Sequence, residues 1–394
     1  MKFSSISLTL LAMLPGGAMA AGYYLPNQDA FATSRGNAWV ATADSAAAVF
    51  YNPAGLIQIK QPEAQAGLHA IVLDTTMTSG GVATENKKEL QTVPNLYYAQ
   101  PANDKLALGF SLNSPFGLGN DWGRDTPFSS VITEARMIYI SATAAAAYKV
   151  TDEFSLGASL SLNYVDLLLE QGLGLPNSFM QFNGSDYGVS AGVGAIWQPH
   201  EKHSFGLTYV TESTFDLEGK TISSIPGVLP DDPNAQLDFI APARAAGGYS
   251  YRPAPGWNLE ANIEWLNYDE LNDLVLRSAT VGGSRAIPFQ WKSSFIYEIG
   301  GSYTTPDGYV FAIGYDFNES SQPDKYYSPS VADSNLHWLN LGFGRKMDRY
   351  SWMLGYQFGY SNREVDGAIG ASAPANGKYE IRHNTLIFSW NQKF

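Results

Sequence analysis

The chain of 394 residues contains no cysteine, few charged residues and no long apolar segment. Without cysteine it has no disulfide framework, no thiolate metal ligand and no cysteine nucleophile. Charged residues make up only 15% of the chain, which is low for a soluble surface of this size. No stretch after residue 20 is apolar enough to form a transmembrane helix. These absences argue against a helical membrane protein and disfavour an ordinary soluble domain.

What the sequence has instead is alternation of apolar and polar side chains. The chain ends in NTLIFSWNQKF, and successive side chains of a strand point to opposite sides, so this segment has one apolar face and one mostly polar face. From Leu386 to Phe394, only Gln392 departs from the apolar face. The same alternation recurs at residues 154–164, 257–265 and 350–360. The apolar residues of the last strand are Leu386, Phe388, Trp390 and Phe394.

An apolar strand at the very end of a chain favours a transmembrane β-barrel. In such a barrel the last strand must pair with the first, because an open sheet edge is not tolerated in lipid. The terminal Phe394 resembles an outer-membrane insertion signal. The alternative is an ordinary edge strand of a soluble sheet.

The start of the chain has the pattern of a secretory signal. Lys2 precedes an apolar run over residues 6–14, and small residues follow at 18–20. This run is too short to span a bilayer as a helix. We therefore expect residues 1–20 to be a signal peptide, cleaved between Ala20 and Ala21. The net charge of −13 disfavours nucleic acid as a partner.

Breaks in the alternation predict the number of strands. Six short polar turns alternate with seven longer stretches rich in Gly, Pro, Asn and Asp, which predicts fourteen antiparallel strands over residues 61–394. Both ends then lie on the short-turn side, as in bacterial outer-membrane barrels. The short turns lie near 101–104, 150–153, 199–202, 252–256, 305–308 and 346–349. The long stretches lie near 79–90, 115–135, 169–185, 217–236, 269–289, 319–335 and 364–378.

Residues 21–60 do not fit the barrel pattern. They are rich in small residues, partly helical in pattern, and end near the turn Asn52-Pro53-Ala54-Gly55. A barrel of fourteen strands encloses more space than its own side chains fill. We therefore expect an N-terminal plug, or hatch, inside the lumen. The alternative is a periplasmic tail.

Four motifs, taken in order, make the chain resemble the FadL-type outer-membrane transporters of long-chain fatty acids and other hydrophobic compounds. The resemblance covers nearly the whole chain after residue 20, and it implies a fourteen-stranded barrel plugged by an N-terminal hatch. The motifs are Ala21-Gly22-Tyr23, Tyr51-Asn52-Pro53-Ala54-Gly55-Leu56, Ser114-Pro115-Phe116-Gly117-Leu118 followed by Trp122-Gly123-Arg124, and residues 147–157.

The resemblance also implies a mechanism. Ligand is captured among the outer loops, passes to a site inside the barrel, and leaves sideways into the membrane where strand three kinks against the hatch. Residues Asn52, Pro53, Ala54 and Gly55 would then form the hatch gate, although they could also be only a tight turn. Tyr23 and Phe116 become candidates for ligand binding, with lumen packing as the alternative for Tyr23.

A fatty-acid carboxylate inside the barrel would need a cation or several hydrogen-bond donors. Alternation places Arg244 and Lys292 inward, the latter between an outward Trp291 and Ser293. The alternative is a structural network with inward carboxylates. Weaker candidates nearer the loops are Arg136, Arg277 and Arg285; the inward carboxylates are Glu260, Glu264, Glu298 and Asp316.

Catalysis, metals and cofactors are not expected. The closest pair of histidines, His200 and His203, lies in one turn without the helical spacing of a zinc site, and no GxSxG motif is present. We expect an outer-membrane protein of a Gram-negative cell, monomeric, in contact with membrane lipid and lipopolysaccharide and inserted by the barrel assembly machinery. The alternatives to fatty-acid uptake are an aromatic or alkane hydrocarbon channel and, less favoured, an open porin.

Overall fold

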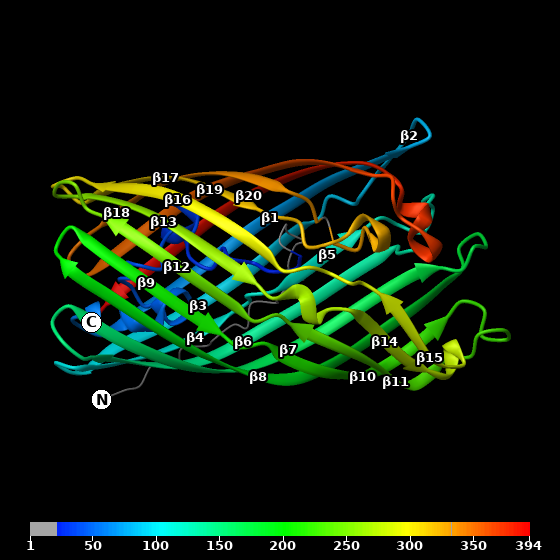
Figure 1. Cartoon of the computed structure of the whole chain (residues 1–394), viewed down its shortest axis with the longest axis horizontal. Helices are drawn as coiled ribbons and strands as arrows, with labels where there is room; N and C mark the ends of the chain where they lie inside the picture. The colour runs from blue at the N-terminus through cyan, green and yellow to red at the C-terminus, as the bar shows by residue number, and fades with distance from the viewer. Residues whose placement is uncertain (1–21, 332) are drawn as a thin grey trace, which may run out of the picture.

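A computed structural model describes residues 22–331 and 333–394, which form a closed antiparallel barrel (Figure 1). The expected signal peptide and its cleavage point lie outside these residues. Within them, no helix is both long and apolar enough to cross a membrane.

The barrel has the fourteen strands that alternation predicts. Closure comes from the pairing of the first with the last strand, which runs from Glu63↔Lys393 to Thr78↔Lys378. Nine strands are continuous: β1 (Glu63–Ser79), β3 (Leu90–Asn103), β6 (Glu134–Lys149), β7 (Phe154–Gly172), β8 (Phe179–His200), β17 (Tyr309–Asn318), β18 (Leu336–Lys346), β19 (Tyr350–Val365) and β20 (Gly377–Lys393). The short β2 (Val82–Glu85) folds back on β1 outside this count.

The other five strands are each interrupted. Two of the interruptions contain a proline, Pro115 or Pro242, which has no N–H to give to a ladder. The interrupted strands are β4 (Leu106–Asn113) with β5 (Gly117–Asp121), β9 (His203–Val210) with β10 (Ser213–Ser223), β11 (Asp232–Ala241) with β12 (Arg244–Tyr251), β13 (Trp257–Leu266) with β14 (Asp273–Ser278), and β15 (Gly283–Pro288) with β16 (Ser294–Thr304).

The connections confirm the predicted arrangement of short and long ends. All six short turns lie between the expected strands, and they gather at the left end of Figure 1, whereas the long connections lie at the right. Several long stretches are shorter than predicted. The predicted break at 269–289 is wrong in this respect, because β14 and β15 pair with each other across most of it.

Side chains alternate across the barrel wall as the sequence predicts. On the last strand Leu386 is 51% exposed, whereas its neighbour Thr385 is fully buried. The apolar residues of 154–164 are likewise exposed, with Leu160 at 64%. The apolar faces therefore point outward to lipid, and the polar faces point into the lumen.

Residues 22–60 lie inside the barrel (Figure 1). They form α1 (Ala30–Ser34), α2 (Ala48–Tyr51) and the 3₁₀-helix η1 (Pro53–Gln58). Helices this short are not stable alone, so contacts with the wall must hold them. α1 packs on β17 to β20, and η1 packs on β6 to β8. Of the further 3₁₀-helices, η2 (Tyr268–Glu270) lies in the interruption between β13 and β14. The outer loops contain η3 (Ala279–Val281), η4 (Asp324–Tyr326) and η5 (Gly370–Ala375).

Candidate functional site

Strand three is broken between β4 and β5, and the N-terminal segment fills the break. The register with β6 shifts by one residue between Asn113↔Ser141 and Gly117↔Ile138. At the break the backbone N–H of Leu25 donates to the carbonyl of Pro115 over 2.8 Å. The N–H of Gly117 donates to the carbonyl of Tyr23 over 3.0 Å. Between these two hydrogen bonds, Tyr24 and Phe116 form an isolated antiparallel β-bridge.

Beyond this break the barrel wall has a gap. The ladder between β3 and β4 ends at Leu96↔Leu112, and β5 is paired with β6 on its other side. In the described part of the chain, no ladder joins β5 to β3. The side-chain amide of Gln91 crosses the gap and donates to the carbonyl of Gly119 over 2.8 Å. At its outer end the gap is bridged by the N–H of Lys87, which donates to the carbonyl of Asp121 over 2.7 Å. Strand three therefore borders a stretch of wall that no ladder closes.

Aromatic rings surround Tyr23 at the inner side of this break. The Tyr23 ring is 3% exposed, and its centroid lies 5.9 Å from that of Phe116. On its other sides lie Phe239 at 5.3 Å, Tyr268 at 5.3 Å and Trp291 at 5.6 Å. Tyr23 thus stands at the centre of an aromatic cluster that touches strand three.

An apolar cavity of 240 Å³ lies among the outer ends of the strands and the outer loops. It reaches the aromatic cluster through Phe289, whose ring lies 5.7 Å from that of Trp291. At its rim the Arg124 guanidinium donates to both carboxylate oxygens of Glu170, and these hydrogen bonds raise the pKa of Arg124. The apolar lining includes Val131, Ile132, Leu169, Met180, Phe182, Leu237, Leu274, Leu276, Ile287 and Phe289.

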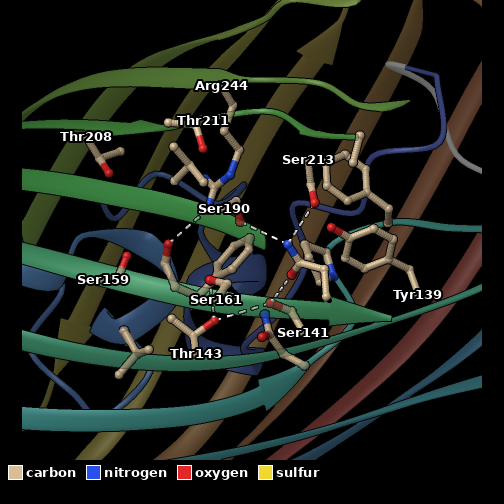
Figure 2. Close-up of a pocket in the computed structure, with 18 of the residues that line it drawn as sticks. Tyr139, Ser141, Thr143, Ser159, Ser161, Ser190, Thr208, Thr211, Ser213 and Arg244 are labelled. Atoms are coloured by element: carbon tan, nitrogen blue, oxygen red, sulfur yellow. Dashed lines mark hydrogen bonds between the residues drawn. The ribbon is translucent and has the colours of Figure 1, made fainter. Parts of the chain in front are cut away.

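A second, polar cavity lies on the lumen side of the break. This hydroxyl chamber has a volume of 40 Å³ and is bordered by Pro115 and Phe116 of the kink, by Pro53 of η1 and by Arg244. Figure 2 shows how the hydroxyl groups of neighbouring strands converge on it. These belong to Ser141, Thr143, Ser159, Ser161, Ser190, Thr208, Thr211 and Ser213.

The turn Asn52–Gly55 is fixed to the wall of the barrel. The Asn52 amide donates to the carbonyls of Val40 at 2.9 Å and Ala195 at 3.1 Å, and its oxygen accepts from the N–H of Ala54. A Cβ at Gly157 would overlap the backbone of η1, so this glycine permits the close approach. The predicted gate residues are therefore brought together, next to the hydroxyl chamber. Their role as a moving gate stays a prediction.

Arg244 points inward, as alternation predicts. Its guanidinium lies 3.2 Å from a Glu264 carboxylate oxygen, donates to the carbonyl of Phe50 over 3.2 Å, and stacks on the Phe50 ring at 4.5 Å. Glu264 also accepts from the hydroxyl of Tyr24. Arg244 is thus already paired within a lumen network, the alternative that the sequence left open.

Lys292 does not point into the lumen, so its predicted direction is wrong. It is exposed, and its neighbour Trp291 is buried instead. The chain leaves the strand between β15 and β16, and Gln290 adopts a φ of 45° there. Ile287, Phe289 and Trp291 face inward before the strand resumes, whereas Ser294 and Ile296 do so after it. The alternation therefore shifts by one residue between 291 and 294, where the chain is not a strand.

The four carboxylates predicted to face the lumen do so, and they are bound by neighbouring groups. Glu260 lies 3.6 Å from the buried Arg35 and accepts from the N–H of Ala41. Glu264 is paired with Arg244, as described above. Glu298 accepts a hydrogen bond from the Asn262 amide, and Asp316 accepts one from the Asn340 amide. No group of three or more His, Asp or Glu side chains in the described residues is arranged to hold a metal ion.

Sequence reasoning missed the contact that holds the start of the segment. Asp333, in the outer loop that follows η4, is fully buried and accepts a hydrogen bond from the backbone N–H of Gly22 over 3.2 Å. Its other oxygen accepts from the N–H of Gln322, and its carbonyl accepts from Arg363. No local pattern marks Asp333, because its partners lie far away in sequence. We call this contact the Asp333 clasp.

Comparison with known proteins identifies relatives over most of the chain. The family described as outer membrane protein transport protein (OMPP1/FadL/TodX) matches residues 11–361. A long-chain fatty acid transport protein of Salmonella typhi is 21% identical over 77% of this chain and 78% of its own length. Outer membrane protein P1 of Haemophilus influenzae is 21% identical over 91% and 90%.

Solved structures share the fold. A FadL homologue of Pseudomonas aeruginosa superimposes with a TM-score of 0.86 at 18% identity, covering 95% of this chain and all of the other. The toluene transporter TodX of Pseudomonas putida gives 0.77 at 18% identity, over 94% and 99%. The chain belongs to the OMPP1/FadL/TodX family of outer-membrane proteins of Gram-negative bacteria, which are non-enzymatic channels for hydrophobic compounds.

Proposed function

We propose that the protein takes up long-chain fatty acids or similar hydrophobic compounds and releases them sideways into the outer membrane. Ligand enters the apolar cavity among the outer loops, displaces Tyr23 from the aromatic cluster, and leaves through the gap beside β5. The observation that carries this route is the position of Tyr23–Leu25, which fills the break in strand three between the cavity and the gap.

Physical chemistry favours lateral release. Transferring apolar surface from the lumen directly to lipid keeps it out of water, whereas a periplasmic exit would expose it. The contacts that must break are two main-chain hydrogen bonds to strand three, the aromatic packing around Tyr23, the Asp333 clasp, and the hydrogen bonds of the Tyr23 and Tyr24 hydroxyls. The ligand can replace the packing, because its own apolar surface takes the place of the Tyr23 ring.

A channel for uncharged aromatic or alkane hydrocarbons is the second candidate. One observation favours it over a carboxylate ligand: Arg244 is paired with Glu264, and Lys292 points away from the lumen.

Lipopolysaccharide contact, insertion by the assembly machinery and a monomeric state stay predictions.

A reversible crosslink tests the route. Tyr24 and Phe116 form a pair flanked by hydrogen bonds on both sides, the arrangement that brings Cα atoms within about 4.5 Å. Because the chain has no cysteine, the double variant Tyr24→Cys/Phe116→Cys would form a defined disulfide. We expect oxidation to abolish uptake of radiolabelled oleate and toluene by intact cells, and reduction to restore it. Each single variant controls for the lost aromatic ring. If uptake continued in the oxidised double variant, the route past strand three would be wrong.

A further inference from the structure

The hydroxyl chamber lies where a departing ligand would place its head. Phe116, at the kink, forms part of its border, and the gap in the wall begins just beyond. The volume of 40 Å³ is enough for a few water molecules and too small for an alkyl chain. A ligand whose chain lies against Phe116 could therefore place only a small polar head in the chamber.

The chamber offers both hydrogen-bond donors and acceptors: Ser190 and Ser213 accept from Asn163 and keep their own hydroxyl hydrogens. Ser141 donates its hydroxyl hydrogen to the Asn163 oxygen over 2.8 Å, and both amide hydrogens of Asn163 go to Ser190 and Ser213. Thr208 and Thr211 donate to backbone carbonyls. A hydroxyl group has one hydrogen but two lone pairs, so these groups keep accepting capacity after their hydrogens are used. An uncharged O–H head can use both the hydrogens and the lone pairs, whereas a carboxylate can use only the hydrogens and brings a charge into the chamber.

Charge around the chamber also disfavours an anion. Of the described residues that line it, Arg244 alone is charged, and its guanidinium is paired with Glu264 and the Phe50 carbonyl. Drawing Arg244 away to bind a carboxylate would leave Glu264 buried without its partner, which is costly. The wall therefore presents no uncommitted positive charge to a ligand head.

We propose that the hydroxyl chamber binds the O–H head of an uncharged long-chain alcohol while its alkyl chain lies at the kink. This assigns the protein a preference for neutral alcohols over carboxylates of equal chain length. The inference rests on the proposed route past Tyr23, and it adds to that route a site that selects the head group.

Binding of three ligands with ten carbons tests the assignment. The purified full-length barrel is titrated with 1-decanol, decanoate and decane, and bound ligand is counted by native mass spectrometry. We expect 1-decanol to bind most tightly. The double variant Thr143→Val/Ser161→Ala removes two hydroxyls that bond each other over 2.8 Å, so neither is left without its partner. We expect it to weaken 1-decanol binding about fivefold for each acceptor lost and to leave decane binding unchanged.

A matched control separates the chamber from general effects on the lumen. Thr221 and Ser278 form a similar buried pair at 2.6 Å, near the outer loops and away from the chamber. Thr221→Val/Ser278→Ala should leave the order of the three affinities unchanged. Tighter binding of decanoate than of 1-decanol, or equal loss for 1-decanol and decane in the chamber variant, would overturn the assignment.

Failure of the site and failure of the route give different results. If the chamber does not select the ligand's head group, all three ligands still bind. Oxidation of the double variant Tyr24→Cys/Phe116→Cys then still blocks their uptake. If the route itself is wrong, the oxidised crosslink leaves the uptake of all three unchanged, whatever their order of affinity.

Discussion

The two ends of the segment inside the barrel are held in different ways. At the Asn52 end, the side-chain amide bonds to wall and hatch carbonyls, and the Gly157 position lets the backbones touch. At the Tyr23 end, two main-chain hydrogen bonds, ring packing and the Asp333 clasp hold the chain against an interrupted strand. We propose that the Asn52 end anchors the segment and the Tyr23 end moves.

The largest expected effect comes from forcing the anchor away from the wall. In Gly157→Val the new side chain would overlap the backbone of Pro53 and Ala54, a position where neither neighbour can rotate away. Overpacking of this kind costs about 1–3 kcal/mol. We expect a lower temperature of unfolding, measured by the shift in gel mobility on heating. In Gly247→Val, where a Cβ meets only the Leu207 side chain, the temperature should barely change. Equal effects of the two variants would argue against the anchor.

A smaller loss is expected when the anchor keeps its shape but loses its hydrogen bonds. Asn52→Ala leaves the carbonyls of Val40 and Ala195 without this donor, at a cost of about 1–3 kcal/mol for a buried group left unpaired. The same heating assay should show reduced stability, and proteolysis should cut the segment more readily. Asn52→Asp, similar in size but without the N–H donors, places a buried carboxylate against these carbonyls and should lose at least as much stability as the alanine variant. Full stability of both variants would show that packing alone fixes this end.

The smallest effect on stability is expected at the releasable end. In Asp333→Asn the amide oxygen can keep the bonds from Ser321 and Gln322, which places the NH2 group against the N–H of Gly22 and breaks the clasp. We expect a smaller fall in unfolding temperature than in Asn52→Ala, because one backbone group instead of two loses its partner. We also expect an increase in the uptake rate of hydrophobic ligand, because the Tyr23 end is released more easily. Asp324→Asn provides the control, since Asp324 contacts Arg363 but not Gly22. A slower uptake in Asp333→Asn would mean that the clasp assists transport instead of restraining it.

The fold could be predicted because its signals are local. Period-two alternation and turn chemistry decide each strand and short turn, and the predicted outward face of Leu386 and its neighbours is confirmed. The same logic placed Arg244 correctly. It was wrong for Lys292, because the inward face changes from odd to even positions between 291 and 294, and no residue pattern announces that shift.

The candidate site could be predicted only in part. Motifs pointed to Tyr23 and Phe116, and the structure places their rings 5.9 Å apart at the break in strand three. Trp291 and Asp333, which complete the surroundings of the segment, depend on contacts between residues more than two hundred positions apart in the chain. Such contacts are a property of barrel closure and cannot be obtained from any short window of sequence.

The hydrogen bonds at Pro115 and Gly117 have a consequence for the membrane as a permeability barrier. Moving Tyr23–Leu25 away leaves a carbonyl and an N–H unpaired beside hydrocarbon, at a cost of several kcal/mol for each group. On the proposed route, the empty channel rests shut without any energy source, and only a molecule that compensates this cost opens it. A cell could then carry many copies of such a channel without making its outer membrane leaky to water, ions or hydrophilic toxins.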